Sequence, residues 1–98
     1  MTKARFDELI HPSTRLAIVA LLAAADWADF AFVRNELGMS DSALSKQLST
    51  LEDAGYITIE RPVSDQRRRV RTRLTSDGRR AFEEHVAALR EIVGPAVT

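Results

Sequence analysis

The sequence has no cysteine, no long apolar run and no formal net charge. Without cysteine the chain can form neither disulfide bonds nor a thiolate metal site. The longest apolar run, residues 16–25, is too short to span a bilayer, and the N-terminal stretch MTKARFDELI contains acids, which is not typical of a signal peptide. We therefore expect a soluble, cytoplasmic protein with one domain over residues 1–98, which a second copy would help to stabilise.

The absence of net charge conceals a basic segment. Residues 1–59 carry five basic and eight acidic side chains, residues 60–80 carry eight basic and three acidic, and residues 81–98 carry one basic and three acidic. The stretch RPVSDQRRRVRTRLT, from Arg61 to Thr75, alone holds six arginines and one acid. Such a cluster creates a local positive field in a neutral protein, which points to a polyanion as the partner.

Apolar spacing and capping residues predict four helices. Leu44, Leu48 and Leu51 recur at helical spacing after Ser40, a residue type that favours the N-cap position. Gly38 supplies a stop signal before them. The start of the second helix could instead form a short edge strand. The expected helices cover residues 13–25, 30–37, 40–54 and 76–93.

Two alternating segments between the third and fourth helices predict a β-hairpin over residues 56–74. The segment YITIE alternates, and RRVRTRL alternates with Val70, Thr72 and Leu74 on one side and arginines on the other. The order of three helices, hairpin and helix is that of a winged helix-turn-helix. The fold class we expect is therefore mainly α with a small β-hairpin, the terminal helices forming a dimer interface.

A helix-turn-helix places its second helix in the DNA major groove, and here that recognition helix is residues 40–54. If its leucines face the core, the opposite face carries short polar side chains and one cation, which suit base edges and phosphates. Arginines near the hairpin tip would reach flanking phosphates or the minor groove. Asp41 and Asp65 argue mildly against DNA. The expected DNA-contacting residues are Ser40, Ser42, Ser45, Lys46, Ser49, Arg67, Arg68 and Arg69.

These segments resemble the short winged helix DNA-binding domain transcriptional regulators, related to the MarR and ArsR groups. The resemblance rests on LIHPSTRLAIVALL, DFAFVRNELGMSDSALSKQLSTLEDAGYITIE and RRRVRTRLTSDGRRAFEEHVAALREIV, in this order. It implies a homodimeric regulator on a palindromic operator, with the wing at residues 63–69. The sequence departs from the family at Gln47, where relatives often carry histidine, and in the wing segment VSDQ, which lacks the glycine of many relatives.

Apolar side chains at the two ends of the chain exceed what a small core would cover. Packing within the chain is one explanation. Pairing of two copies would also bury them and would set two recognition helices about one DNA turn, ~34 Å, apart. The helix over residues 76–93 would then be the dimerisation helix. The expected interface residues are Phe6, Leu9, Ile10, Phe82, Val86, Leu89, Ile92 and Val93.

The sequence shows no nucleophile elbow and no phosphate-binding glycine loop, so we expect neither an enzyme nor a cofactor. The neighbours of His85 at helical spacing cannot ligate a metal, and His11 before a proline is explained by a helix start, so we expect no metal site. Arg71 and Arg73 could belong to an ordinary solvated strand face, paired with Glu60 or with acids of the last helix.

We expect a sequence-specific regulator of double-stranded DNA, acting as a homodimeric repressor. A winged helix that binds another protein and a nonspecific architectural DNA-binding protein remain as alternatives. A small-molecule effector, of unknown identity, could release the DNA in a further variant of the same hypothesis.

Overall fold

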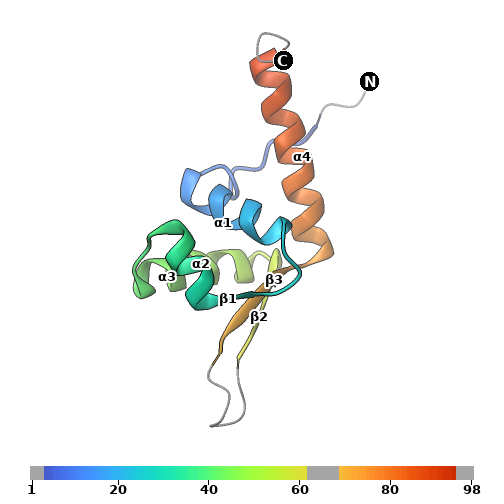
Figure 1. The fold of residues 1–98 in the computed structure, drawn as a ribbon. Coiled ribbons are helices and arrows are strands. Elements are labelled where there is room, and N and C mark those ends of the chain that lie inside the picture. The colour runs from blue at the N-terminus through green and yellow to red at the C-terminus, as the bar shows by residue number, and fades with distance from the viewer. Residues whose placement is uncertain (1–3, 62–68, 95–98) are drawn as a thin grey trace.

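The computed structural model describes residues 4–61 and 69–94 as four helices and a three-stranded antiparallel sheet (Figure 1). The expected mainly α fold with a small β-hairpin is confirmed, with the addition of a short strand before the second helix, whereas the dimer interface stays a prediction. In the described residues, no helix is both long enough and apolar enough to cross a membrane. The elements are α1 (Ser13–Ala23), β1 (Ala28–Asp29), α2 (Phe30–Leu37), α3 (Asp41–Asp53), β2 (Ile57–Glu60), β3 (Arg71–Leu74) and α4 (Ser76–Val93).

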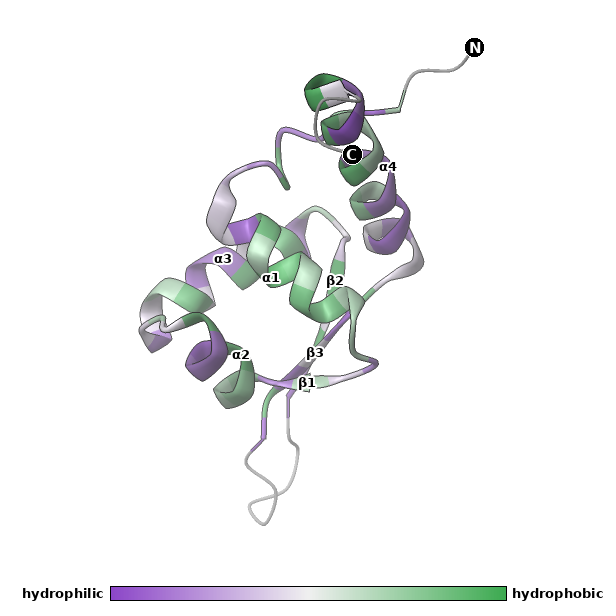
Figure 2. Ribbon diagram, turned by 45° about the horizontal axis from the view of Figure 1, so that its top comes forward, coloured by the Kyte–Doolittle hydropathy of each residue, from purple (hydrophilic) through white to green (hydrophobic). Residues whose placement is uncertain are grey.

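The core lies around α1, which contacts α2, α3, α4 and β3. Figure 2 shows hydrophobic residues along most of α1, as expected of a helix that is apolar on most sides. The leucine stripe of α3 packs against this helix from one side, and the inward residues of the sheet complete the core. The buried cluster consists of Ile18, Val19, Leu22, Ala28, Val33, Leu44, Leu48, Leu51, Ile57 and Leu74.

Local capping residues fix where the helices begin and end. Ser40 Oγ accepts a hydrogen bond from the Ala43 N–H at 3.1 Å, and Thr75 Oγ1 accepts one from the Gly78 N–H at 3.0 Å. Gly38 ends α2 with φ 64°, a left-handed conformation that favours glycine. Because these signals act over three or four residues, they also predict the boundaries well.

The strand β3 lies in the middle of the sheet, whose order is β1-β3-β2. Thr72 pairs with Ile59 on one side and with Ala28 on the other, and it is fully buried. Arg71 and Arg73 alternate with it and are only partly buried or exposed. We call β2 and β3, with the residues that adjoin them, the root of the wing. The root of the wing therefore has one face in the core and one face rich in arginine.

The helix α4 approaches the start of β2 closely at Gly78, in its first turn. A Cβ added to Gly78 would lie 2.1 Å from the carbonyl oxygen of Tyr56, which no side chain could tolerate. The same carbonyl accepts a hydrogen bond from the Thr75 N–H at 3.0 Å. This contact explains a glycine at a helical position, where its propensity is poor.

The N-terminal segment, residues 4–11, passes beside α4 (Figure 1) and is tied to it through His85. His85 is fully buried, and its Nδ1 accepts a hydrogen bond from the Asp7 N–H at 3.0 Å. The Tyr56 hydroxyl donates to Asp7 Oδ2 at 2.6 Å, which links the segment to the start of β2. This hydrogen bond and burial raise the pKa of Tyr56 to about 12.

Candidate nucleic-acid interface

The helix α3 separates apolar and polar residues onto two faces. Leu44, Leu48 and Leu51 are at most 2% exposed. The polar residues expected on the other face are all exposed, and their side chains are short except for that of Lys46. A surface of this composition allows a close approach of the helix to a partner and offers hydroxyl groups and one cation to it. The exposed set is Ser42, Ser45, Lys46 and Ser49.

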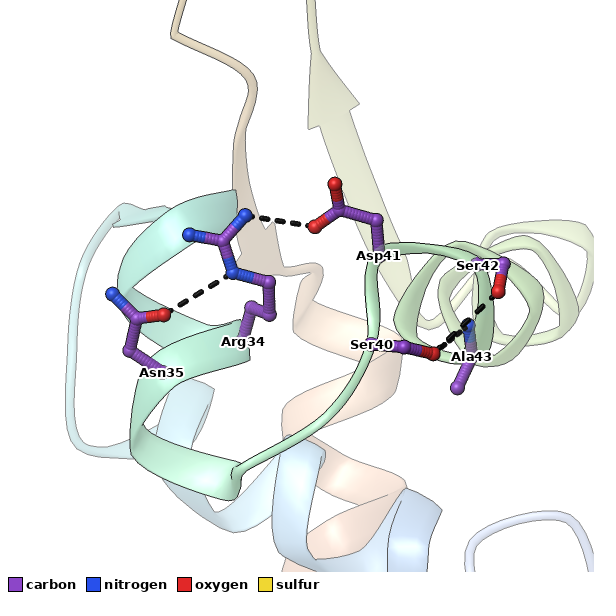
Figure 3. A network of polar contacts seen from close by, with 6 residues as sticks. All are labelled: Arg34, Asn35, Ser40, Asp41, Ser42 and Ala43. Carbon is purple, nitrogen blue, oxygen red and sulfur yellow. Dashed lines mark hydrogen bonds and ion pairs between the residues drawn. The ribbon is translucent and has the colours of Figure 1, made fainter.

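Arg34 of α2 pairs with Asp41, the acid at the start of α3, across the turn that joins the two helices (Figure 3). Arg34 NH1 lies 2.7 Å from Asp41 Oδ1, and Arg34 Nε donates to Asn35 Oδ1 at 3.2 Å. The Asp41 side chain is 71% exposed, so the pair contributes little to stability, about 1 kcal/mol or less. The pair matters for electrostatics instead. The positive charge of Arg34 offsets the negative charge of Asp41, which would otherwise repel a polyanion.

Ser40 is occupied with the backbone of α3 rather than free for a partner. Its Oγ accepts the Ala43 N–H and lies 3.5 Å from Ser42 Oγ (Figure 3). Of the residues expected to meet DNA, Ser40 therefore has a structural role that explains its presence without any ligand.

A groove of about 360 Å³ separates the exposed face of α3 from the root of the wing. Ser45, Ser49 and Arg61 contribute polar atoms to its lining, whereas Leu48 and Val70 are among its apolar residues. Two of the residues expected to contact DNA thus line a concave surface that continues from α3 to the sheet. Arg61 lies there with its NH1 3.8 Å from Glu52 Oε2 of α3.

The described arginines at the wing root are held by acids and by one aromatic ring. Arg71 pairs with Glu60 on the adjacent strand, and the hydrogen bond to this carboxylate raises the pKa of Arg71 above its ordinary value. Arg73 NH2 lies 3.0 Å from Asp26 Oδ1. Both guanidinium groups stack on Trp27, with their carbon atoms 4.4 and 4.9 Å from the ring centroid. These two arginines connect β3 to the segment before β1.

Arg69 differs from Arg71 and Arg73 because it does not stack on Trp27 and its side chain is 73% exposed. Its NH1 lies 3.1 Å from Asp29 Oδ2. Arg69 is the first residue described after the gap at 62–68, and it lies two residues before β3. Arg67 and Arg68, the other two arginines expected to contact DNA, lie outside the described residues.

The match to a protein family is extensive. Residues 14–93 match the family model described as the winged helix DNA-binding domain. The chain belongs to this family. Solved neighbours of this winged helix domain are transcriptional regulators of the MarR family, which confirms the resemblance to that group.

Two solved structures and one sequence relative illustrate the likeness. The transcriptional regulator homologue protein from Pyrococcus horikoshii OT3 is 20% identical with a TM-score of 0.83, covering 89% of this chain and 86% of its own, and shows the fold alone. NadR in complex with 4-hydroxyphenylacetate is 27% identical with a TM-score of 0.70, covering 92% of this chain and 68% of its own. The uncharacterized protein MJ0432 of Methanocaldococcus jannaschii is 24% identical over 85 residues, 87% of this chain and 92% of the relative.

The winged helix domain exposes apolar side chains at the two ends where a dimer interface was expected. Phe6 is 36% exposed, Val93 50% and Ile92 67%. The other residues of the expected set on α4 and the N-terminal segment are partly buried, with the exception of Ile10. The partly buried ones are Leu9, Phe82, Val86 and Leu89.

The expectation for Ile10 does not agree with the structure. Ile10 is 0% exposed in the single chain, so it has no surface to offer to a second copy. The inward face of α4 also differs from the expected stripe, because its buried residues are Gly78, His85 and Ala88. The physical reason is the N-terminal segment, which folds back on α4 and buries one side of it.

The two histidines, His11 and His85, lie near each other beside the ring of Phe6. Their ring centroids are 5.4 Å apart, and the ring of Phe6 lies 4.6 Å from His11 and 4.7 Å from His85. Over residues 4–61 and 69–94, no group of three or more potential ligands could hold a metal ion. The Nε2 atom of His85 is buried without a hydrogen-bond partner in the structure.

Sequence reasoning missed the functional environment of Trp27. The segment ADWAD indicates only an interruption between helices, and Trp27 only a core or interface residue. In the structure, the flanking acids Asp26 and Asp29 pair with Arg73 and Arg69, respectively. The available signal was an aromatic residue flanked by acids in a chain whose arginines are concentrated elsewhere.

Proposed function

We propose that this protein is a cytoplasmic transcriptional regulator that binds double-stranded DNA sequence-specifically, without catalytic activity. The observation that carries the proposal is the exposed face of α3, where Ser42, Ser45, Lys46 and Ser49 lie opposite a fully packed leucine stripe. The pairing of Arg34 with Asp41 removes the main charge that would oppose a phosphate backbone at the start of this helix.

In the proposed complex, α3 enters the major groove and the serine hydroxyls and Lys46 contact base edges and phosphates. The arginines at positions 67–69 contact flanking phosphate or the minor groove from the wing. The groove between α3 and the wing root is lined by Ser45 and Ser49, whose hydroxyl groups would meet the sugar-phosphate backbone between these two contact regions. Bound over a promoter, such a protein would act as a repressor by occlusion.

We further propose that the regulator acts as a homodimer on a palindromic operator. Ile92 and Val93 expose apolar surface at the far end of α4, and Phe6 does so on the segment beside it. Burying such side chains between two copies would be favourable, at about 25 cal/mol per Å² of apolar surface. A two-fold arrangement would place two copies of α3 about one DNA turn apart.

A small-molecule effector is a second element of the proposal. A cleft of about 550 Å³ lies between the N-terminal segment and the start of α4, lined by polar residues that include Arg5, Asp7 and Tyr56. NadR, a structural neighbour, was crystallised in complex with the small molecule 4-hydroxyphenylacetate. A ligand in this cleft would contact both α4 and the start of β2, the elements that connect the dimer end to the wing.

The test of DNA binding compares two variants that change α3 or a distant cation. We expect the double variant Ser45→Ala/Lys46→Ala to bind an operator duplex on the order of tenfold more weakly, because base and phosphate contacts are worth about 1–3 kcal/mol. Arg80→Ala removes one exposed positive charge at the start of α4 and should change the affinity little. Wild-type affinity in a folded double variant would exclude this face of α3 from the interface.

A further inference from the structure

The structure gives an acid partner to every arginine that it describes in the basic segment between residues 61 and 74. Glu52 faces Arg61, and Glu60 faces Arg71. The other two pairs join the wing root to the segment between α1 and α2, because Asp26 meets Arg73 and Asp29 meets Arg69. The positive field expected from the sequence is therefore reduced at the root of the wing, in the protein without a partner.

Asp29 has a position that distinguishes its pair from the others. It is the N-cap residue of α2, where an aspartate side chain usually accepts a hydrogen bond from the helix backbone. Here its side chain makes no cap hydrogen bond, and its Oδ2 instead lies 3.1 Å from Arg69 NH1. The carboxylate of Asp29 thus pairs with Arg69 and does not cap the helix that it precedes.

The backbone around Asp29 is fixed, so its carboxylate is held in place beside the wing. Asp29 pairs with Arg71 in the antiparallel register of β1 and β3. The next residue, Phe30, donates its N–H to the Val70 carbonyl at 2.7 Å. Asp29 is 38% exposed at its side chain and Arg69 is 73% exposed, so the pair lies at the surface where a phosphate could reach the arginine.

We propose that Asp29 acts as an internal competitor of DNA phosphate for Arg69, and so sets the strength of the phosphate contact made at the wing root. This proposal rests on the proposed function, since it names a residue that tunes DNA binding. In the free protein, Arg69 is paired with the carboxylate. Contact with a phosphate requires the arginine to leave Asp29, or to share its charge with it, and both reduce the gain from the phosphate. Asp29 is a positioning residue in this account, because it acts through Arg69 and touches no nucleotide.

The size of the effect follows from the exposure of the pair. Ion pairs at this degree of exposure are worth about 0.2–1 kcal/mol, which corresponds to a change in affinity of up to about fivefold. The salt dependence of binding provides a second readout. An arginine freed from its acid neutralises one more phosphate, which makes the log–log slope of affinity against salt steeper by up to about one.

The experiment is a double-mutant cycle on the full chain, with a labelled duplex of arbitrary sequence as the probe. We expect Asp29→Asn to raise affinity at low salt about two- to fivefold and to steepen the salt slope. In the Arg69→Ala background, the same Asp29→Asn change should give a clearly smaller gain, no larger than that of the control below, because the ion pair that the change breaks is then absent. Asp53→Asn, which removes an exposed acid of α3, controls for general electrostatics.

Stability provides a check that the variants remain comparable. Because the Asp29 side chain does not cap α2, Asp29→Asn removes only the exposed ion pair with Arg69, and the urea midpoint, followed by the fluorescence of the single tryptophan, Trp27, should fall only slightly. An equal gain from Asp29→Asn in the Arg69→Ala background, or from Asp53→Asn, would overturn the competition. A loss of affinity on Asp29→Asn would also overturn it, because Asp29 would then orient Arg69 toward DNA.

The same titration separates this inference from the proposed function. A wild-type chain that binds no duplex even at low salt would overturn both. A wild-type chain that binds duplex with a steep salt dependence, while the cycle shows no coupling between Asp29 and Arg69, would overturn the inference and leave the regulator intact.

Discussion

Replacing Gly78 by alanine should destabilise the protein, although the same change within most helices is stabilising. Gly78 lies in the first turn of α4, and its Cα faces the backbone of Tyr56. An added Cβ would be 2.1 Å from the Tyr56 carbonyl oxygen and 2.9 Å from its carbon. Both are backbone atoms, so no side-chain rotation can relieve the clash. The helix must move away from the start of β2.

The change in the free energy of unfolding combines two destabilising contributions and one stabilising contribution. Overpacking costs about 1–3 kcal/mol. Movement of α4 also breaks the hydrogen bond from the Thr75 N–H to the Tyr56 carbonyl, 3.0 Å long, which adds about 0.5–1.5 kcal/mol. The better helix propensity of alanine returns about 1 kcal/mol. We therefore expect Gly78→Ala to lower the free energy of unfolding by roughly 1–3 kcal/mol.

Urea denaturation followed by Trp27 fluorescence measures this change, at one protein concentration because a dimer would make stability concentration-dependent. Glu83→Ala, at an exposed position of the same helix, is the matched control and should change stability by about 0.5 kcal/mol or less. If Gly78→Ala is as stable as the wild type or more stable, the close approach of α4 to Tyr56 is refuted.

Two further predictions concern His85 and the end of α4. Burial, and then the neighbouring His11, lower the pKa of His85, while Asp7 and Glu8 oppose this shift. Just below pH 6.5, only the unfolded state binds this proton readily. The free energy of unfolding should therefore decrease as the pH is lowered below 6.5, and His85 should add no pH dependence above that value. Urea unfolding at pH 7.5 and 5.5 should show that His85→Gln removes much of this fall and His11→Gln keeps most of it, whereas an unchanged fall in His85→Gln contradicts the prediction. Ile92 is 67% exposed, and Ile92→Glu should convert a dimer to monomer in sedimentation at micromolar concentration, whereas a wild type that sediments only as a monomer rules out the dimer.

The helices were predictable because their signals are local. Ser40, Gly38 and Thr75 each act within one helical turn, and the structure shows the caps and the left-handed glycine that their residue types favour. The division of α3 into leucine and serine faces follows equally from helical periodicity. Thus the helices and the exposed face of α3 could be derived from local signals in the sequence.

The environment of the arginines could not be derived in this way. Arg69 and Asp29 are 40 positions apart, and only the pairing of β1 with β3 brings them together. The edge strand considered at the start of the second helix lies just before it, at Ala28–Asp29. A strand of two residues has too little pattern to predict which strand it pairs with, so the acids beside Trp27 had no predicted partner. Of the alternatives left open for Arg71 and Arg73, Glu60 is the partner of Arg71, because both lie in one hairpin. Arg73 pairs with Asp26 and not with an acid of the last helix.

The burial of Ile10 and His85 was hidden for a related reason. Apolar residues near the N-terminus and along α4 have the same composition whether they meet each other or a second copy. The hydrogen bond from the Asp7 N–H to His85 joins residues 78 positions apart, where the N-terminal segment packs on α4. The periodicity of α4 in the sequence placed Phe82 and Val86 on its apolar stripe. In the structure, both side chains are only partly buried.

The most direct test of the proposed regulator is selection of genomic duplex fragments by the wild-type chain across a salt series, followed by sequencing of the bound fragments. A dimer that contacts ~6 phosphates should lose affinity with a log–log slope near −5, and the bound pool should be enriched in an inverted repeat with half-sites ~34 Å apart. Absence of binding at low salt would contradict the proposal, and the exposed face of α3 would then belong to a protein partner.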